Sequence, residues 1–145
     1  QKEIFEDVLA SSLEEDCSFQ VVRSVHEQIL ELITQHAETK NPEPLELSVR
    51  EVSGILHNCG VPEERVEVFQ EKCSEGFGEA ASLNPNNIID SKKFEIKTPQ
   101  VKISVDPEFS YLVETRMIDG RKYILIPSDE GVEINGVKVT TDSQE

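Results

Sequence analysis

The sequence predicts an α+β fold, in which about four N-terminal helices are followed by a C-terminal antiparallel β-meander packed on them. Two observations support this prediction. Up to about residue 78 the apolar residues recur every three or four positions, whereas from about residue 90 they alternate with polar ones. We therefore expect one α+β domain over residues 1–145, with a helical part at 1–78 and a β part at 90–141. Two small domains joined near residues 76–90 are the alternative.

Two helices are expected before about residue 40. The first, over about residues 2–15, is indicated by five apolar residues at helical spacing, namely Ile4, Phe5, Val8, Leu9 and Leu13. The second ends near Glu38 and has an apolar stripe formed by Phe19, Val22, Val25, Ile29 and Ile33. Asp16 or Ser18 is expected to cap this second helix, because a side-chain oxygen at that position accepts a hydrogen bond from an unpaired backbone N–H.

The next two helices are predicted from the signals at their ends. Ser48 and Glu51 have the spacing of a capping box, in which each side chain accepts a hydrogen bond from the backbone N–H of the other. Gly60 stands where helices commonly end in a left-handed residue. Pro62 is expected to start the fourth helix, since proline is favoured in a first helical turn. Residues 75–87 are interpreted as a connector.

Half-buried strands and two hairpins are expected in the β part. Alternation with polar neighbours indicates strands around Phe94 and Ile96 and around Val101, Ile103 and Val105. Asp119-Gly120 and Asn135-Gly136 each match a two-residue hairpin turn. These turns fix the following cross-strand pairs: Met117 with Lys122, Thr115 with Ile124, Val113 with Ile126, and Glu133 with Lys138. An opposed ion pair is favourable, so the last pair supports the predicted register.

The chain is strongly acidic, with a formal net charge of −15 from 14 basic and 29 acidic residues. Residues 1–82 carry 18 acids and 6 bases, so most of the negative charge lies in the helical part. Such a surface repels phosphates, so nucleic acid is an unlikely partner. No apolar run is long enough to span a bilayer, so no membrane association is expected. Three cysteines without a CxxC spacing favour reduced thiols and a cytoplasmic location.

We expect no metal and no cofactor. The stretch from His26 to Leu30 begins like a zinc-protease motif but lacks the second histidine, so His26 is interpreted as a partly buried helix residue. His57, Cys59 and Cys73 offer three zinc-ligand types, but both cysteines occupy apolar helical positions and no fourth ligand is evident. The dinucleotide-like glycine pattern at residues 76–81 follows a helix rather than a strand, which is the wrong context for phosphate binding.

One candidate binding surface emerges from the strands. The basic residues of a possible anion or partner face are Lys93, Lys97, Lys102, Arg116 and Arg121. If neighbouring strands align them, this face is suited to an anion, a nucleic-acid backbone or an acidic protein. Solubilising residues on edge strands are the alternative interpretation. No catalytic constellation is evident; an enzymatic site would need a deep cleft lined by residues such as His57, Asp119 or Tyr123.

The segments "KTP", "LVETR", "IDGRKYILI", "DEGVE" and "NGV" between residues 94 and 137 resemble the C-terminal part of a bacterial family of unknown function, found mainly in Firmicutes. The stretches "VHEQILE" (25–31) and "REVSGILHNCGV" (50–61) are similar to it as well. Proteins of that family are longer, so we expect this chain to be a fragment without its N-terminal region. The resemblance implies an intracellular bacterial protein, and it implies no activity, cofactor or catalytic residue.

The sequence therefore favours a non-catalytic structural or protein-interaction domain. Its partner is expected to be an unknown protein or the missing N-terminal region. The alternative is an anion- or nucleic-acid-associated binding module that uses the basic face described above.

Overall fold

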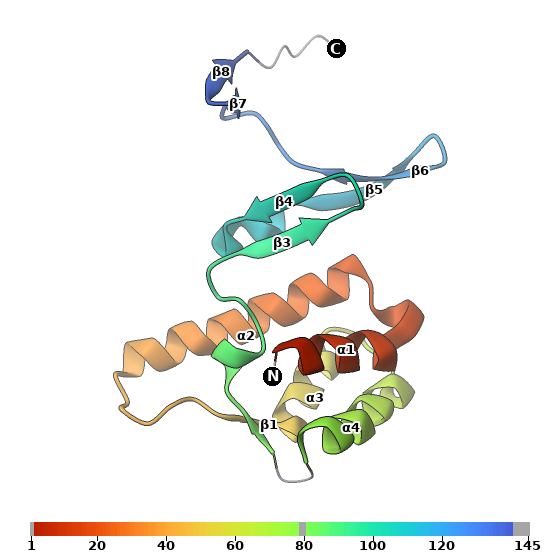
Figure 1. Ribbon diagram of the computed structural model, residues 1–145, viewed down its shortest axis with the longest axis vertical. Helices are drawn as coiled ribbons and strands as arrows, with labels where there is room; N and C mark the ends of the chain where they lie inside the picture. Colours follow the sequence, from red (N-terminus) through yellow and green to blue (C-terminus); the bar gives the residue numbers. More distant parts are fainter. Residues whose placement is uncertain (1, 79–80, 141–145) are drawn as a thin grey trace. The chain divides into compact units, whose positions relative to one another are not determined.

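The structure is a computed structural model that describes residues 2–78 and 81–140 (Figure 1). The chain divides into two compact units, of which the first ends at Pro107 and the second begins at Glu108. The helices of the first unit are α1 (Lys2–Leu13), α2 (Phe19–Thr39), α3 (Val49–Asn58) and α4 (Glu63–Phe77), with short 3₁₀ segments η1 (Glu14–Asp16) and η2 (Pro85–Asn87). Its strands are β1 (Leu47–Ser48), β2 (Ser82–Leu83), β3 (Phe94–Lys97) and β4 (Lys102–Val105).

The second unit consists of hairpins. A 3₁₀ segment, η3 (Pro107–Leu112), leads into it; its strands are β5 (Glu114–Ile118), β6 (Arg121–Leu125), β7 (Val132–Ile134) and β8 (Val137–Val139). Apart from the two-residue strand β1, the α-helices precede the antiparallel strands along the chain, which confirms the predicted α+β class. None of the helices in the described parts of the chain is both long and apolar enough to cross a bilayer.

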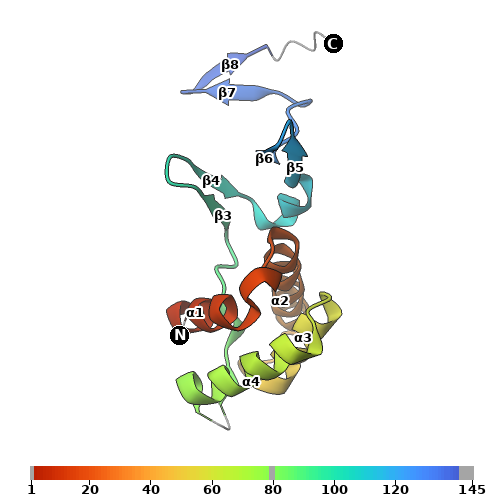
Figure 2. The same cartoon turned by 90° about the vertical axis from the view of Figure 1, so that its right-hand side faces the viewer.

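The hydrophobic core of the first unit lies among its helices. α1 and α4 lie side by side (Figure 1, Figure 2), and α3 also packs on α4. The rings of Phe5 and Phe69 meet edge to face at a centroid distance of 6.3 Å, and Phe69 is fully buried. The core cluster runs along the chain from Phe5 to Ile89, so the segment that follows α4 contributes to it. Apolar burial of this kind is the main source of folding free energy.

The capping interactions and the left-handed residue predicted at the helix ends are present in the structure. Ser18 Oγ accepts a hydrogen bond from Val21 N at the start of α2. Both bonds of the Ser48–Glu51 capping box are formed at the start of α3. Gly60 has φ = +88°, as expected for the left-handed residue after a helix, and its N–H donates to the His57 carbonyl. These local predictions are confirmed.

The connector interpretation of residues 75–87 is only partly correct. α4 continues to Phe77, and β2 and η2 follow, whereas residues 79–80 lie outside the described residues. β2 pairs antiparallel with β1, so that Leu83 lies opposite Leu47 and both leucines are buried. Two-residue strands have no periodicity of their own, so this pairing depends on tertiary contacts that a sequence pattern does not record.

The predicted hairpin registers are confirmed. Met117 lies opposite Lys122 and Thr115 opposite Ile124, while Glu133 lies opposite Lys138. The turn residues Asp119, Gly120, Asn135 and Gly136 have φ values of 49°, 79°, 52° and 81°, which are those of two-residue type I′ turns.

One predicted pair is wrong. Val113 does not pair with Ile126, because the ladder of the β5–β6 hairpin ends at Glu114 and Leu125. Val113 instead donates its backbone N–H to the Ser110 carbonyl, which closes a turn at the end of η3.

The strands form separate hairpins rather than one continuous meander. Among the described residues, β3 pairs only with β4, β5 only with β6, and β7 only with β8. The six-residue segment η3 stands between β4 and β5, and Pro127 and Gly131 (φ = +118°) interrupt the chain between β6 and β7. Neither connection is a tight hairpin turn, which explains why the expected sheet is divided.

Candidate functional site

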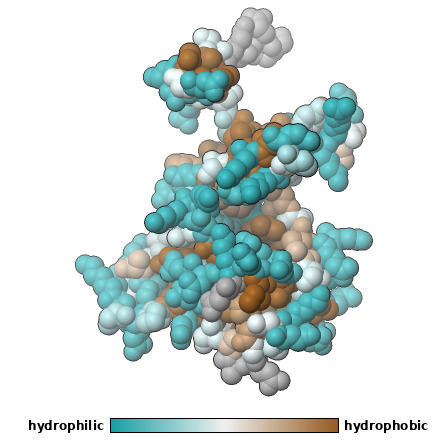
Figure 3. Space-filling model, in the orientation of Figure 1, coloured by the Kyte–Doolittle hydropathy of each residue, from teal (hydrophilic) through white to brown (hydrophobic). Residues whose placement is uncertain are grey.

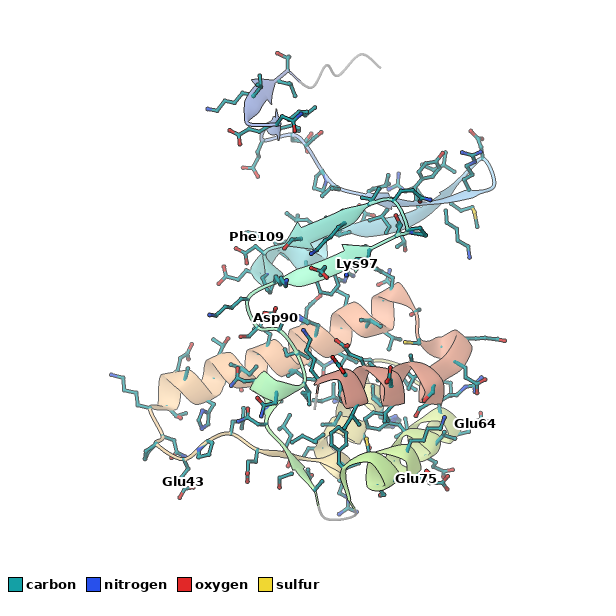
Figure 4. The ribbon with its side chains drawn as sticks, in the orientation of Figure 1. Glu43, Glu64, Glu75, Asp90, Lys97 and Phe109 are labelled. Atoms are coloured by element: carbon teal, nitrogen blue, oxygen red, sulfur yellow. The ribbon has the colours of Figure 1, made fainter. Side chains whose placement is uncertain are left out.

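Three of the five basic residues expected to form a binding face come together on the β3–β4 hairpin. The ammonium groups of Lys93, Lys97 and Lys102 lie 3.4, 3.7 and 3.3 Å from the carboxylate of Glu95. The hairpin register explains this arrangement, because Lys97 lies opposite Lys102 and Glu95 is two residues earlier on the same face. Figure 4 labels Lys97 on this hairpin. We call these four residues the lysine cluster.

Electrostatics keeps Glu95 ionised within the lysine cluster. Loss of hydration raises the pKa of the Glu95 carboxyl, but hydrogen bonds and charge attraction from Lys102 and Lys93 outweigh this effect and hold the pKa below its usual value of 4.5. The cluster therefore carries three positive charges and one negative charge at neutral pH. Each ion pair is solvent-exposed, so it adds little to stability.

The other two basic residues belong to a different hairpin. Arg116 lies on β5 and Arg121 on β6, in the second unit, and Arg116 pairs with Glu114 at 3.6 Å. The structure thus groups Lys93, Lys97 and Lys102, and it places Arg116 and Arg121 in a separate compact unit.

A cavity of about 350 Å³ lies in the first unit, between α1, α2 and residues 88–95. Its apolar lining is formed by Phe5, Leu9, Val22, Val25, Ile88, Ile89 and Phe94. Its polar lining is formed by Lys2, Glu6, His26, Asp90, Lys93 and Glu95. The volume is at the lower end of the range for small-molecule sites. Sequence reasoning missed this cavity because its walls come from three segments that are distant along the chain.

His26 is held in this cavity by the backbone. Its Nε2 lies 2.9 Å from the carbonyl oxygen of Asp90 (labelled in Figure 4), and because that oxygen only accepts, Nε2 is the donor of this hydrogen bond. The ring also meets Phe94 edge to face at 5.3 Å. The partly buried position expected for His26 is confirmed. Its role in the structure is to join α2 to the segment that leads into β3.

Two carboxylates at the cavity wall, Asp90 and Glu95, are held in their ionised form. The backbone N–H of Lys92 donates to the Asp90 carboxylate at 2.8 Å, and this bond, aided by the positive charges of Lys2 and Lys93, lowers the pKa of Asp90. Glu95 is likewise ionised beside Lys93. The pKa values of Asp90 and Glu95 are thus both lowered by neighbouring donors and positive charges.

The remaining candidate residues do not gather at the cavity. His57, Asp119 and Tyr123 are exposed and do not line it. Within residues 2–78 and 81–140, no group of three or more His, Cys, Asp or Glu side chains is arranged to hold a metal ion. Burial raises the pKa of the Cys73 thiol to about 11, so this sulfur is protonated at neutral pH and is a poor ligand or nucleophile.

The second unit exposes many apolar side chains. Of its described residues, 108–140, only Ser110 and Val113 are buried. Its exposed large apolar residues are Phe109, Tyr111, Leu112, Met117, Ile118, Tyr123, Ile126, Ile134 and Val137. The rings of Phe109 (labelled in Figure 4) and Tyr111 are 6.4 Å apart. Apolar residues also reach the surface of the β7–β8 hairpin in the space-filling view (Figure 3).

Residues 1–137 match the family described as Domain of unknown function (DUF4317), and the chain belongs to this family. The expected membership of a family without an assigned function is thereby confirmed. No curated protein and no solved structure shows a significant match to the chain.

Proposed function

We propose that this chain is a non-catalytic protein-interaction domain whose second unit, from Glu108 onward, contacts the partner. The observation that supports this proposal is the near absence of a core in that unit, where only Ser110 and Val113 are buried among the described residues. Two-stranded hairpins are marginally stable in water unless they bury apolar surface. A partner that covers the exposed side chains would supply that burial.

The composition of the exposed side chains supports a protein partner. Phenylalanine, tyrosine and methionine are enriched in protein interfaces, and Phe109, Tyr111, Met117 and Tyr123 are all exposed in the second unit. Large contiguous apolar patches on a protein surface commonly mark protein interaction sites. The first unit, with its own helical core, would serve as the stable platform.

The proposed setting is the cytoplasm of a bacterium. The bacterial origin rests on the family resemblance of the sequence. The cytoplasmic location is supported by the cysteines, because Cys17, Cys59 and Cys73 are all present as thiols, and a secreted domain of this size commonly pairs its cysteines.

Site-specific photo-crosslinking in cells that express the protein tests the proposal. A benzophenone amino acid at Tyr111 or Tyr123 should cross-link one and the same protein, identified by mass spectrometry. Matched control sites are Glu31 on α2 and Glu67 on α4, which are exposed in the first unit and should give no such product. Absence of cross-links from both tyrosine sites, or equal cross-linking from the control sites, would show the proposal to be incorrect.

A second candidate function is anion binding by the lysine cluster. The observation in its favour is the convergence of three ammonium groups on a single carboxylate, which leaves two positive charges in excess. Titration with inorganic phosphate and with a short single-stranded oligonucleotide, at low and at moderate salt, tests it. Binding should weaken with salt and be lost in Lys102→Glu, whereas Lys40→Glu, just after the end of α2, should bind normally. Salt-independent binding, or normal binding by Lys102→Glu, would exclude this function.

The wider basic face can be tested in the same titration. If Arg116 and Arg121 contribute to it, Arg116→Glu should weaken binding as Lys102→Glu does. Normal binding by Arg116→Glu would restrict the anion site to the lysine cluster.

A further inference from the structure

We propose that the free edge of β6 binds an extended segment of the partner protein as an added antiparallel strand, and that this segment has apolar residues followed by two acidic ones. This inference rests on the protein-interaction function proposed above and specifies the partner's chemistry. It follows from the hydrogen-bonding pattern of the β5–β6 hairpin and from the charges on β6.

The hairpin register determines which main-chain groups of β6 point outward. Ile118 and Arg121 flank the two-residue turn, and such a flanking pair is hydrogen-bonded within the hairpin. Hydrogen-bonded and non-hydrogen-bonded pairs alternate in an antiparallel ladder. The N–H and C=O groups of Lys122 and Ile124 therefore face away from β5. In the described chain β6 has no strand on that side, so these two residues offer two donors and two acceptors to a further strand.

Charge distinguishes the β6 edge from the β5 edge. On β5, the guanidinium of Arg116 already pairs with Glu114. On β6, by contrast, Arg121 and Lys122 are adjacent cations that form no ion pair with any described residue. A partner strand with carboxylates opposite these two residues would neutralise them, and directly opposed charges of unlike sign stabilise a pair of strands.

The antiparallel register then specifies the order of residues in the partner. Moving along β6 from Arg121 to Leu125 corresponds to moving backward along the partner. The partner residues opposite Leu125, Ile124 and Tyr123 therefore come first in the partner's sequence. They should be apolar or aromatic, to match the β6 side chains that they face. The residues opposite Lys122 and Arg121 come next and should be acidic. The segment reads as three apolar residues followed by two acids.

A second copy of this chain fits the edge less well. If β6 paired with β6 of another copy about Tyr123, then Arg121 would lie opposite Leu125 and Lys122 opposite Ile124. That arrangement pairs apolar residues with cations and leaves the four cations of the two copies without counter-charges. An acidic strand from a different protein satisfies both the main-chain groups and the charges.

Peptide titration followed by NMR tests the inference on the full chain. The probe is a synthetic ten-residue peptide with three consecutive valines followed by two glutamates, and the control peptide has lysines in place of the glutamates. We expect the probe to shift the amide signals of Lys122 and Ile124 most strongly. The control peptide should bind about tenfold more weakly or more, as the loss of two charge pairs implies.

Two proline variants separate the two edges. Ile124→Pro removes an outward N–H of β6, and Thr115→Pro removes the N–H at the paired position of β5. Proline is tolerated on an edge strand where the N–H is not part of the ladder, so the hairpin should persist in both variants. The cross-strand contact between Met117 and Lys122 reports its presence. Ile124→Pro should weaken binding of the probe peptide about tenfold, which is the effect of one lost hydrogen bond. Thr115→Pro should bind the probe peptide with normal affinity.

Several results of these experiments would overturn the proposed strand addition. No binding up to millimolar peptide, equal binding of both peptides, or equal effects of the two proline variants would overturn the inference. Concentration-dependent dimerisation that Ile124→Pro abolishes would assign the edge to a second copy and overturn it as well. Cross-links from Tyr111 or Tyr123 whose yield is undiminished in Ile124→Pro would refute strand addition at β6 while leaving the protein-interaction function intact.

Discussion

Removal of the second unit should leave the first unit folded. A chain that ends at Pro107 retains every residue of the core cluster, which runs from Phe5 to Ile89. Among the described residues, the one buried apolar side chain that it loses is Val113, at 1% exposure. Full burial of a valine stabilises by about 1.5–3 kcal/mol, which sets the scale of the expected loss. By comparison, Phe69→Ala in the full chain should cost about 3–5 kcal/mol, because it removes a fully buried ring from the core.

Urea denaturation, followed by the circular dichroism of the helices, measures both variants. The truncated chain should unfold in one cooperative transition, with a free energy of unfolding within about 3 kcal/mol of the full chain. A larger loss, or a truncated chain without a cooperative transition, would refute the reasoning. Such a result would mean that the helical core depends on residues beyond Pro107. The first unit could then not serve as a stable platform for an interaction by the second unit.

Three further outcomes are expected. Ser48→Ala should lower the free energy of unfolding by about 1–2 kcal/mol, more than Ser18→Ala, because Ser48 belongs to a complete capping box; urea denaturation measures both. Glu95 should titrate below pH 4.5 by NMR. Because its folded pKa is lowered, its stabilising contribution is present above that pH and is lost as the pH falls through the folded pKa, and Glu95→Gln should remove this part of the acid dependence. Cys73 should resist iodoacetamide at pH 8 until the chain unfolds, since its pKa is raised to about 11, and mass spectrometry would detect the adduct.

The sequence by itself determined the features whose energetics are local. The capping box of Ser48 and Glu51 joins groups three residues apart, so the residue types at that spacing were sufficient to predict it. The Asp119-Gly120 and Asn135-Gly136 turns fixed the pairing of their flanking strands for the same reason, since a two-residue turn leaves a single register. The order of helices and strands followed from periodicity, which reflects which side of each element is buried.

Only the tertiary structure decided what distant segments do together. The cavity beside His26 depends on α1, α2 and residues 88–95, and the β1–β2 pairing joins residues more than thirty positions apart. The same holds for the separation of the hairpins. Alternation predicted half-buried strands around Phe94 and Ile103, and burial does alternate along β3 and β4, whereas β5 is exposed along its whole length. A hydrophobic pattern indicates that a side chain is suited to burial. Only the packing of the chain, or the binding of a partner, determines what covers that side chain.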